Sequence, residues 1–207
     1  HSHVFPDHLA GRALNAISEK SGGILPVSNG TLADTLEKGR AWGIDRFVFQ
    51  NIATSPKQQT KVNDFAISLV SAGHYAFGSV HPDAEDALDE LSRLKNKGIF
   101  GVKLHPHYQS FTIDDPRLAP IYEEMQRLCL PVLFHSGQEI AYPEDDKAAP
   151  WRLAEVVKAY PRMTVIAAHM GGWKDAEGVL THLAGLPLYF DTAFSYLRRS
   201  GGEASRR

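Results

Sequence analysis

The chain has 207 residues, of which 43% are hydrophobic and 22% charged, so it has enough apolar material for a large globular core. A formal net charge of −2 gives no electrostatic reason to expect a nucleic acid or an anionic membrane as partner, and no apolar run approaches the ~20 residues of a membrane span. The single cysteine, Cys129, excludes an internal disulfide framework and is typical of a reducing compartment, so we expect a cytoplasmic protein.

Short apolar segments recur along the chain and predict β-strands. The first expected strand ends at His1-Ser2-His3, with most of it missing upstream. Most later segments are rich in β-branched or aromatic residues and do not alternate with polar ones, which is typical of strands buried on both faces. These segments lie at residues 46–51, 75–80, 98–104, 131–134, 163–168 and 188–190.

Amphipathic segments lie between these strands and predict helices. Two of them begin with a capping residue followed by proline, Ser55-Pro56 and Asp115-Pro116. The alternation of strands and helices indicates a parallel α/β fold, either an open doubly wound sheet or a (β/α)8 barrel. No glycine-rich phosphate-binding motif follows the early strands, which disfavours a dinucleotide-binding sheet. Helices are expected near residues 31–42, 56–72, 83–97, 116–128, 150–160 and 173–184.

The fold predicted from this pattern is an incomplete (β/α)8 TIM barrel of the α/β class. Since a typical barrel has about 250 residues, we expect the first strand to be partial and the eighth βα unit to be missing. Residues 1–194 contain no evident linker and predict one barrel domain, whereas residues 195–207 carry four arginines without apolar periodicity and predict a disordered tail. The open edges of such a barrel favour association, for example as a homo-oligomer.

Histidines follow several of the predicted strands. His1 and His3 are two residues apart, so on a strand their Cα atoms lie roughly 6.6 Å apart on one face and their imidazoles can share a cation. This pair is a weak signal alone, but four further histidines stand at the carboxyl ends of separate strands, where α/β barrels carry their active sites. Convergent imidazoles favour Zn²⁺ or a similar divalent ion. The four are His81, His105, His135 and His169.

Side-chain alternation predicts which residues point into the barrel. Lys103 shares a face with His105, and an interior lysine is costly unless it is paired or modified, so Lys103 is a candidate functional residue as well as a possible snorkelling one. His135 is expected on the face of Leu133, and His169 on the face of Val165 and Ala167. The acidic loop at residues 138–149, which contains Glu139, is interpreted as a solvated loop, with a cover over the mouth of the barrel as the alternative.

Five motifs in chain order resemble those of the metal-dependent amidohydrolase superfamily, in the branch of small amidohydrolase-related hydrolases and nonoxidative decarboxylases. The resemblance spans about residues 1–194 and implies a (β/α)8 barrel with a divalent metal at its C-terminal mouth. The motifs are His1-Ser2-His3-Val4-Phe5-Pro6-Asp7, Gly101-Val102-Lys103-Leu104-His105-Pro106, Leu133-Phe134-His135-Ser136-Gly137, Ala167-Ala168-His169-Met170-Gly171-Gly172 and Tyr189-Phe190-Asp191-Thr192.

The resemblance also implies roles for single residues. His1 and His3 match the first-strand metal ligands, and His135 matches the fifth-strand ligand. His169 matches the sixth-strand histidine, which binds a second metal or acts on the substrate, and Lys103 lies where some members use a carboxylated lysine.

One departure from the family pattern concerns the acidic ligand. The family places a metal-binding aspartate after the eighth strand, usually in a Gly-(Thr/Ser)-Asp-x-Pro run, which this sequence lacks. Asp191 belongs to the seventh strand and is interpreted as a polar residue that orients neighbouring loops, with a metal-binding or base role as the alternative. The site is therefore expected to lack its usual carboxylate.

Three functions follow as hypotheses. The first is a metal-dependent hydrolase, in which Zn²⁺ on His1, His3 and His135 activates a water molecule against a small amide, ester or lactone, with His169 and Lys103 as catalytic residues. The second keeps the metal but catalyses nonoxidative decarboxylation of an aromatic or unsaturated acid. The third is a non-catalytic barrel fragment. A small-molecule substrate is the partner expected for either enzyme.

Overall fold

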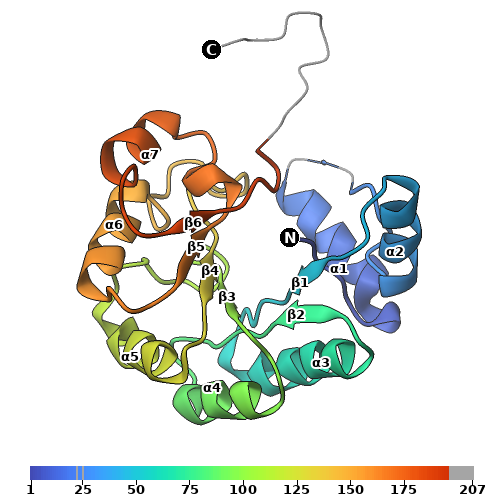
Figure 1. Cartoon of the computed structure of the whole chain (residues 1–207). Helices are drawn as coiled ribbons and strands as arrows, with labels where there is room; N and C mark the ends of the chain where they lie inside the picture. Colours follow the sequence, from blue (N-terminus) through green and yellow to red (C-terminus); the bar gives the residue numbers. More distant parts are fainter. Residues whose placement is uncertain (22, 25, 196–207) are drawn as a thin grey trace, which may run out of the picture.

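A curved parallel sheet surrounded by helices forms the centre of the structure (Figure 1). The computed structural model describes residues 1–21, 23, 24 and 26–195, so the predicted tail, except Ser195, lies outside the described residues. The strands are β1 (Val48–Gln50), β2 (Tyr75–Phe77), β3 (Val102–Leu104), β4 (Val132–Phe134), β5 (Val165–Ala167) and β6 (Tyr189–Phe190). The α-helices are α1 (Asp7–Lys20), α2 (Leu32–Ala41), α3 (Gln59–Ser71), α4 (Ala87–Asn96), α5 (Ala119–Leu128), α6 (Pro150–Ala159) and α7 (Ala176–His182).

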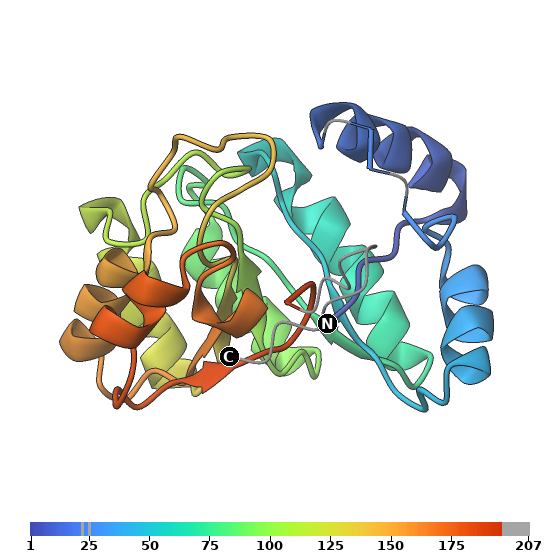
Figure 2. The same cartoon turned by 90° about the horizontal axis from the view of Figure 1, so that it is seen from above.

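All strand pairs in the described residues are parallel and follow chain order. β1 pairs with β2, and β3, β4, β5 and β6 form a four-stranded sheet. A bridge between Gly78 and Val102 joins the two sheets, and a bridge between Ser2 and Phe49 places the N-terminal segment beside β1. No such pairing closes β6 onto Ser2 within the described residues, and both views show the N-terminus between β1 and β6 (Figures 1 and 2). The predicted incomplete (β/α)8 barrel is therefore confirmed.

All six predicted helices are present, and one of the two predicted capping side chains makes its capping bond. Asp115 accepts a hydrogen bond from the backbone N–H of Arg117, and Pro116 opens a short 3₁₀ turn before α5. The Ser55 side chain makes no capping bond, although Pro56 opens a similar turn before α3. Helix α1 was not predicted, and only Ala10 of its residues is buried.

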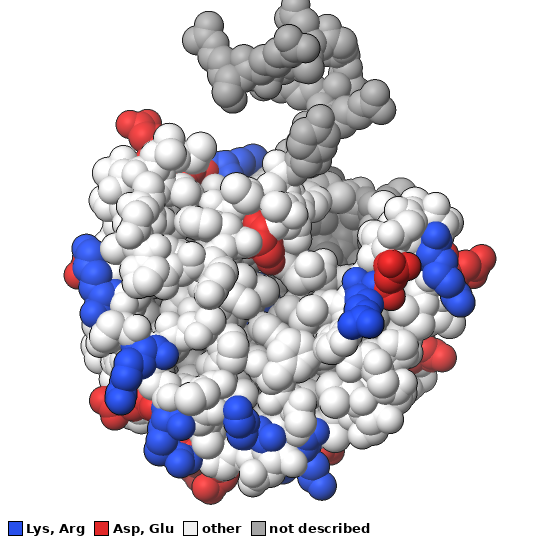
Figure 3. All heavy atoms as spheres, viewed as in Figure 1, with Lys and Arg blue, Asp and Glu red and all other residues white. Residues whose placement is uncertain are grey.

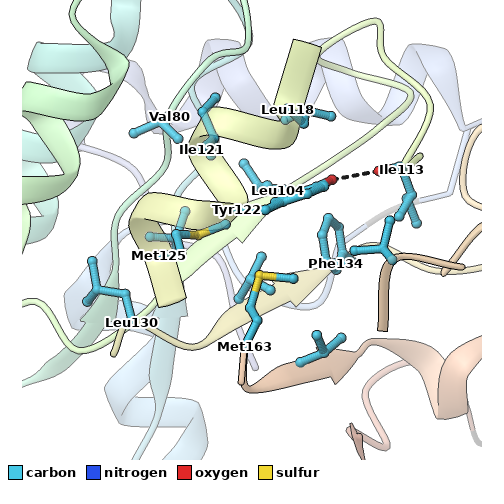
Figure 4. Packing of buried hydrophobic residues seen from close by; sticks show 14 of the residues in the cluster. Val80, Leu104, Ile113, Leu118, Ile121, Tyr122, Met125, Leu130, Phe134 and Met163 are labelled. Atoms are coloured by element: carbon cyan, nitrogen blue, oxygen red, sulfur yellow. Dashed lines mark hydrogen bonds between the residues drawn. The ribbon is translucent and has the colours of Figure 1, made fainter. Parts of the chain in front are cut away.

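The main hydrophobic core lies between the sheet and the helices. Figure 4 shows part of it, where Tyr122 of α5 packs near Phe134 of β4 and donates a hydrogen bond to the carbonyl of Ile113 at 2.7 Å. A second cluster on the opposite face of the strands contains Phe77, Leu133 and Ala168. Since the helices pack on the first face, this second face is the barrel interior.

The predicted alternation holds on two strands and fails on a third. Val102 and Leu104 pack in the main core, and Lys103 is in register with Leu133 of the interior cluster, as expected. The expectation that Val165 and Ala167 share the face of His169 is wrong, because both pack in the main core. His169 itself has a φ of 58°, and this left-handed turn breaks the alternation.

No helix in the described ranges is long and apolar enough to cross a membrane. On the face shown in Figure 3, basic and acidic side chains are interspersed around the periphery. This face therefore presents no extended patch of one charge sign.

Gln109 forms hydrogen bonds to backbone groups that follow the carboxyl ends of β1, β2 and β3. Its amide Nε2 donates to the carbonyl oxygens of Ala53 and Val80, each at 2.9 Å, and its Oε1 accepts from the backbone N–H of His105 at 2.8 Å. We expect Gln109→Ala to lower the free energy of unfolding by about 2–3 kcal/mol, because three buried backbone groups lose their partner. Urea unfolding measures this loss.

Gln58→Ala is the matched control, because the Gln58 side chain is exposed and, among the described residues, accepts a hydrogen bond from the Thr54 hydroxyl alone. The control should change the free energy of unfolding by no more than about 0.5 kcal/mol. An equally small effect of Gln109→Ala would contradict the assignment of Gln109 as the connection between the strand ends.

Candidate metal centre

His1 and His3 lie on one side of the N-terminal segment, as predicted. Ser2 between them donates to the carbonyl of Val48 at 3.2 Å and accepts from the N–H of Gln50 at 2.8 Å, which fixes the segment as a strand. The ring centroids of the two histidines are 5.3 Å apart. Nδ1 of His3 lies 2.7 Å from the carbonyl oxygen of Gln50, which can only accept, so Nδ1 carries the ring proton. The unprotonated Nε2 of His3 is thus available to a cation.

The charge state of His3 suits this role. Part of its surface is exposed, but the protein atoms packed around it and the nearby Lys103 lower its pKa below the ordinary value of 6.5. A neutral imidazole is the form that binds a metal.

His169 and Asp191 meet the His1 side chain at the open edge of the barrel. The backbone N–H of His169 donates to Oδ1 of Asp191 at 2.9 Å, and Nδ1 of His169 donates to the carbonyl of Ala193 at 2.7 Å. Oδ2 of Asp191 accepts from Nδ1 of His1. Asp191 therefore orients its neighbours, as interpreted from the sequence, and it also places a carboxylate among the predicted ligands. Burial lowers the pKa of His169, which keeps it neutral.

Lys103 lies on the interior face of β3, close to these groups. The residue is 1% exposed, and its Nζ has no hydrogen-bond partner among the described residues. Burial lowers its pKa to about 7, against the opposing effects of Asp191 and Glu139. The prediction of an interior lysine is confirmed, and the amine is available to an acidic ligand.

His135 belongs to a second group of side chains, together with His105 and Glu139. The rings of His135 and His105 are stacked with centroids 4.1 Å apart. Oε2 of Glu139 lies 3.3 Å from Nε2 of His135 and 3.5 Å from Nε2 of His105. These three ligand atoms all lie within 4.8 Å of one another. Burial lowers the pKa of both imidazoles well below 6.5, so both are neutral.

Glu139 corrects one sequence interpretation. The loop that contains it was interpreted as solvated, but Glu139 is only 8% exposed. The four-residue spacing from His135, across the tight turn at Gly137 with a φ of 89°, brings its carboxylate back to the histidine. The four-residue spacing of His135 and Glu139 was the sequence signal for this contact. It was missed because acidic residues in loops are usually solvated.

His135 connects the two groups through its two ring nitrogens. Its Nδ1 lies 3.3 Å from Nε2 of His169, and its Nε2 faces Glu139 and, at 3.4 Å, the carbonyl of Gln138. Of the four strand-end histidines, three therefore converge. His81 is instead held by its own loop, where its Nδ1 accepts from the N–H of Asp83 at 3.2 Å.

The predicted ligands His1, His3 and His135 do not form a group with ligand atoms all within 4.8 Å of one another in the described residues, where only His105, His135 and Glu139 do. The first group, His1, His3, His169 and Asp191, nevertheless offers donors of the types that divalent cations bind. In the first group Nε2 of His3 and Nε2 of His169 are unprotonated, because backbone carbonyls hold the protons on Nδ1. The carboxylate of Asp191 accepts from His1 in the same way that acidic partners of metal-bound histidines do. Imidazole and carboxylate together are typical ligands of Zn²⁺ and similar ions.

Comparisons with known proteins agree with this fold and with the resemblance of the motifs. A family model described as Amidohydrolase matches residues 31–205, a range that leaves out His1 and His3. No match is found among curated proteins.

Three solved structures show the same fold. An uncharacterized TIM-barrel protein from Bordetella bronchiseptica has a TM-score of 0.67 and 18% identity, over 92% of this chain and 73% of that one. A 5-carboxyvanillate decarboxylase from Sphingomonas paucimobilis has a TM-score of 0.59 and 17% identity, over 88% and 69%. A 4-oxalomesaconate hydratase from Rhodopseudomonas palustris has a TM-score of 0.58 and 18% identity, over 92% and 73%.

At identities of 17–18% the structural likeness shows the fold alone. Two of these three proteins are named as enzymes. The family model, in contrast, covers most of the sequence, including the strands that carry Lys103, His135 and His169. The chain therefore belongs to the amidohydrolase family.

Proposed function

We propose that the protein is a metal-dependent hydrolase of a small amide, ester or lactone, with a divalent cation held by His1, His3 and His135. The observation that carries the proposal is the fixed tautomer of the site histidines. The carbonyl oxygens of Gln50 and Ala193 hold the ring protons of His3 and His169 on Nδ1, so both Nε2 lone pairs are free for a cation or a substrate. Zn²⁺ is the ion that such a donor set favours.

The residues around this group have distinct roles in the proposed reaction. A divalent cation, when bound, would polarise a substrate carbonyl and lower the pKa of water. His169 stabilises the negative charge that develops on the substrate or transfers a proton. Asp191 holds the His1 ring, and Lys103 binds an acidic group of the substrate, since its buried amine has no protein partner in the described part of the chain.

A nonoxidative decarboxylase is the second candidate, and Lys103 is the observation that favours it. A buried amine near the proposed cation can fix the carboxylate that is to be lost. Carbon dioxide release from hydroxybenzoate-like acids, measured beside hydrolysis of a panel of lactones, separates the two reactions. In either case we propose a small-molecule substrate and, from the single exposed Cys129, a cytoplasmic location.

Metal removal tests the proposal. Treatment with a chelator should abolish lactone hydrolysis, and Zn²⁺ should restore it. His3→Gln should weaken Zn²⁺ binding by at least about tenfold, whereas His182→Gln, at an exposed position on α7, should leave it unchanged.

Two results would contradict this proposal. A folded wild-type protein that binds no metal would remove its basis. A folded protein that binds metal but turns over neither substrate class would support the third hypothesis, a non-catalytic barrel.

A further inference from the structure

Gln50, the last residue of β1, has a buried amide whose oxygen has no hydrogen-bond partner in the described part of the chain. The residue is only 2% exposed. Asn63, by contrast, engages both ends of its buried amide, since it donates to the carbonyl of Ser79 at 2.9 Å and accepts from the N–H of the same residue at 2.8 Å. A buried acceptor without a donor destabilises a fold, so it calls for a functional explanation. Within the described residues, the buried polar atoms of this kind lie on or close after β1 and β3, and they are Oε1 of Gln50, Nδ2 of Asn51, Nζ of Lys103 and Nδ1 of His107.

Strand register places the Gln50 side chain beside His3. Ser2 is bridged in parallel to Phe49, so the residues that follow them, His3 and Gln50, are also neighbours, and Nδ1 of His3 donates to the carbonyl of Gln50 at 2.7 Å. On its other side Gln50 is in register with Phe77 of the interior cluster. Since Phe49 packs in the main core, the alternation of the strand turns Gln50 to the interior. The amide therefore lies on the interior face between a proposed metal ligand and an apolar side chain.

Lys103 presents the opposite hydrogen-bonding chemistry inside the same barrel. Its Nζ can only donate, whereas Oε1 of Gln50 can only accept. Lys103 is in register with Leu133 of the interior cluster, so both polar groups face the same interior. The cluster side chains are apolar and can partner neither group. A molecule that pairs with both carries an acidic group for the amine and a hydroxyl or N–H donor for the amide oxygen.

We propose that Gln50 is a specificity-determining residue, whose Oε1 accepts a hydrogen bond from a hydroxyl or N–H group of the substrate. The inference rests on the proposed function, because it places the substrate beside His3, and it deepens that function by naming the substrate class as small acids that also carry such a donor. A substrate without the donor leaves the amide oxygen buried and unpaired in the complex. Sites that hydrogen-bond a substrate hydroxyl discriminate strongly against the analogue that lacks it.

Binding of two acids that differ by one hydroxyl group tests this contact without turnover. The full chain loaded with Zn²⁺ is titrated with mandelate and with phenylacetate, and calorimetry gives each Kd. We expect the wild type to bind mandelate more tightly, and Gln50→Met to reduce the ratio of the two Kd values at least about tenfold. Methionine has a similar volume and only a weak acceptor, so the loss should fall on mandelate and leave phenylacetate almost unchanged.

Gln58→Met is the matched control, because Gln58 is exposed, and it should keep the wild-type ratio. The urea midpoint and the Zn²⁺ affinity of Gln50→Met should not fall, since Oε1 has no protein partner to lose. A lower midpoint would show a structural role for the amide, and weaker Zn²⁺ binding would show a metal ligand. Either result would overturn the inference.

The two acids also separate this inference from the proposed hydrolase. Equal affinity of the wild type for both acids, binding of neither, or a preference that persists in Gln50→Met would overturn the role of Gln50, even if lactones are hydrolysed. A Zn²⁺-loaded wild type that hydrolyses no lactone, but shows a preference for mandelate that Gln50→Met removes, would support the role of Gln50 and contradict the hydrolase instead.

Discussion

Lys103→Met is expected to lower kcat/KM strongly while making the metal-free protein more stable. The ammonium group of Lys103 is buried without a hydrogen bond in the described structure, and methionine fills a similar volume without a charge. The shift of the lysine pKa from 10.5 to about 7 corresponds to a penalty of about 4–5 kcal/mol for the protonated form in the folded state. The substitution removes that penalty.

The stability difference should depend on pH in a defined direction. Between pH 7 and pH 10.5 the unfolded chain holds a proton on Lys103 that the folded protein has lost. The free energy of unfolding of the metal-free wild type should therefore rise with pH across this window, and Lys103→Met should lack this contribution. The free energy of unfolding of Lys103→Met should exceed that of the wild type by the largest amount below pH 7, and this difference should vanish near pH 10.5.

Urea unfolding of the metal-free protein at several pH values measures this effect, and kcat/KM on a lactone substrate measures the loss of function. We expect kcat/KM to fall about 100-fold or more, because the group that binds the acidic part of the substrate is lost. Lys61→Met, at an exposed position on α3, should change neither quantity. A variant at Lys103 that is less stable than the wild type at pH 7 would show that the amine has a stabilising partner.

The strands and their histidines could be predicted because their signals are local. Unbroken apolar segments mark strands buried on both faces, and each histidine that follows such a segment must lie at the carboxyl edge of the sheet. The placement of Lys103 followed from the same alternation. These inferences need only the period of a strand and the common direction of parallel strands.

The features that were missed depend on backbone geometry that the sequence pattern does not encode. His169 could not be placed by alternation, because a left-handed residue ends the strand there. Glu139 is turned inward by the loop after His135, and the contact between Asp191 and His1 joins residues 190 positions apart. Helix α1, of which only Ala10 is buried, was also missed.

Asp191→Asn is expected to weaken cation binding at the His1 and His3 site by about 10–100-fold, with a similar loss of kcat/KM. An asparagine carbonyl can still accept from the backbone N–H groups of His169 and Ala193, which Asp191 holds at 2.9 Å and 3.0 Å. The fold should therefore change little. The loss of affinity is expected from the position of Oδ2, where an amide nitrogen replaces the oxygen that accepts from Nδ1 of His1.

That replacement changes the tautomer of His1. An amide NH₂ can only donate, so Nδ1 of His1 must become the acceptor and its ring proton must move to Nε2. The Nε2 atom then has no lone pair for a cation, although the side chain is still present.

A Zn²⁺ competition titration measures the affinity, and Asp89→Asn, exposed on α4, is the control that should bind like the wild type. Equal affinity of Asp191→Asn and the wild type would show that His1 does not bind the cation through Nε2.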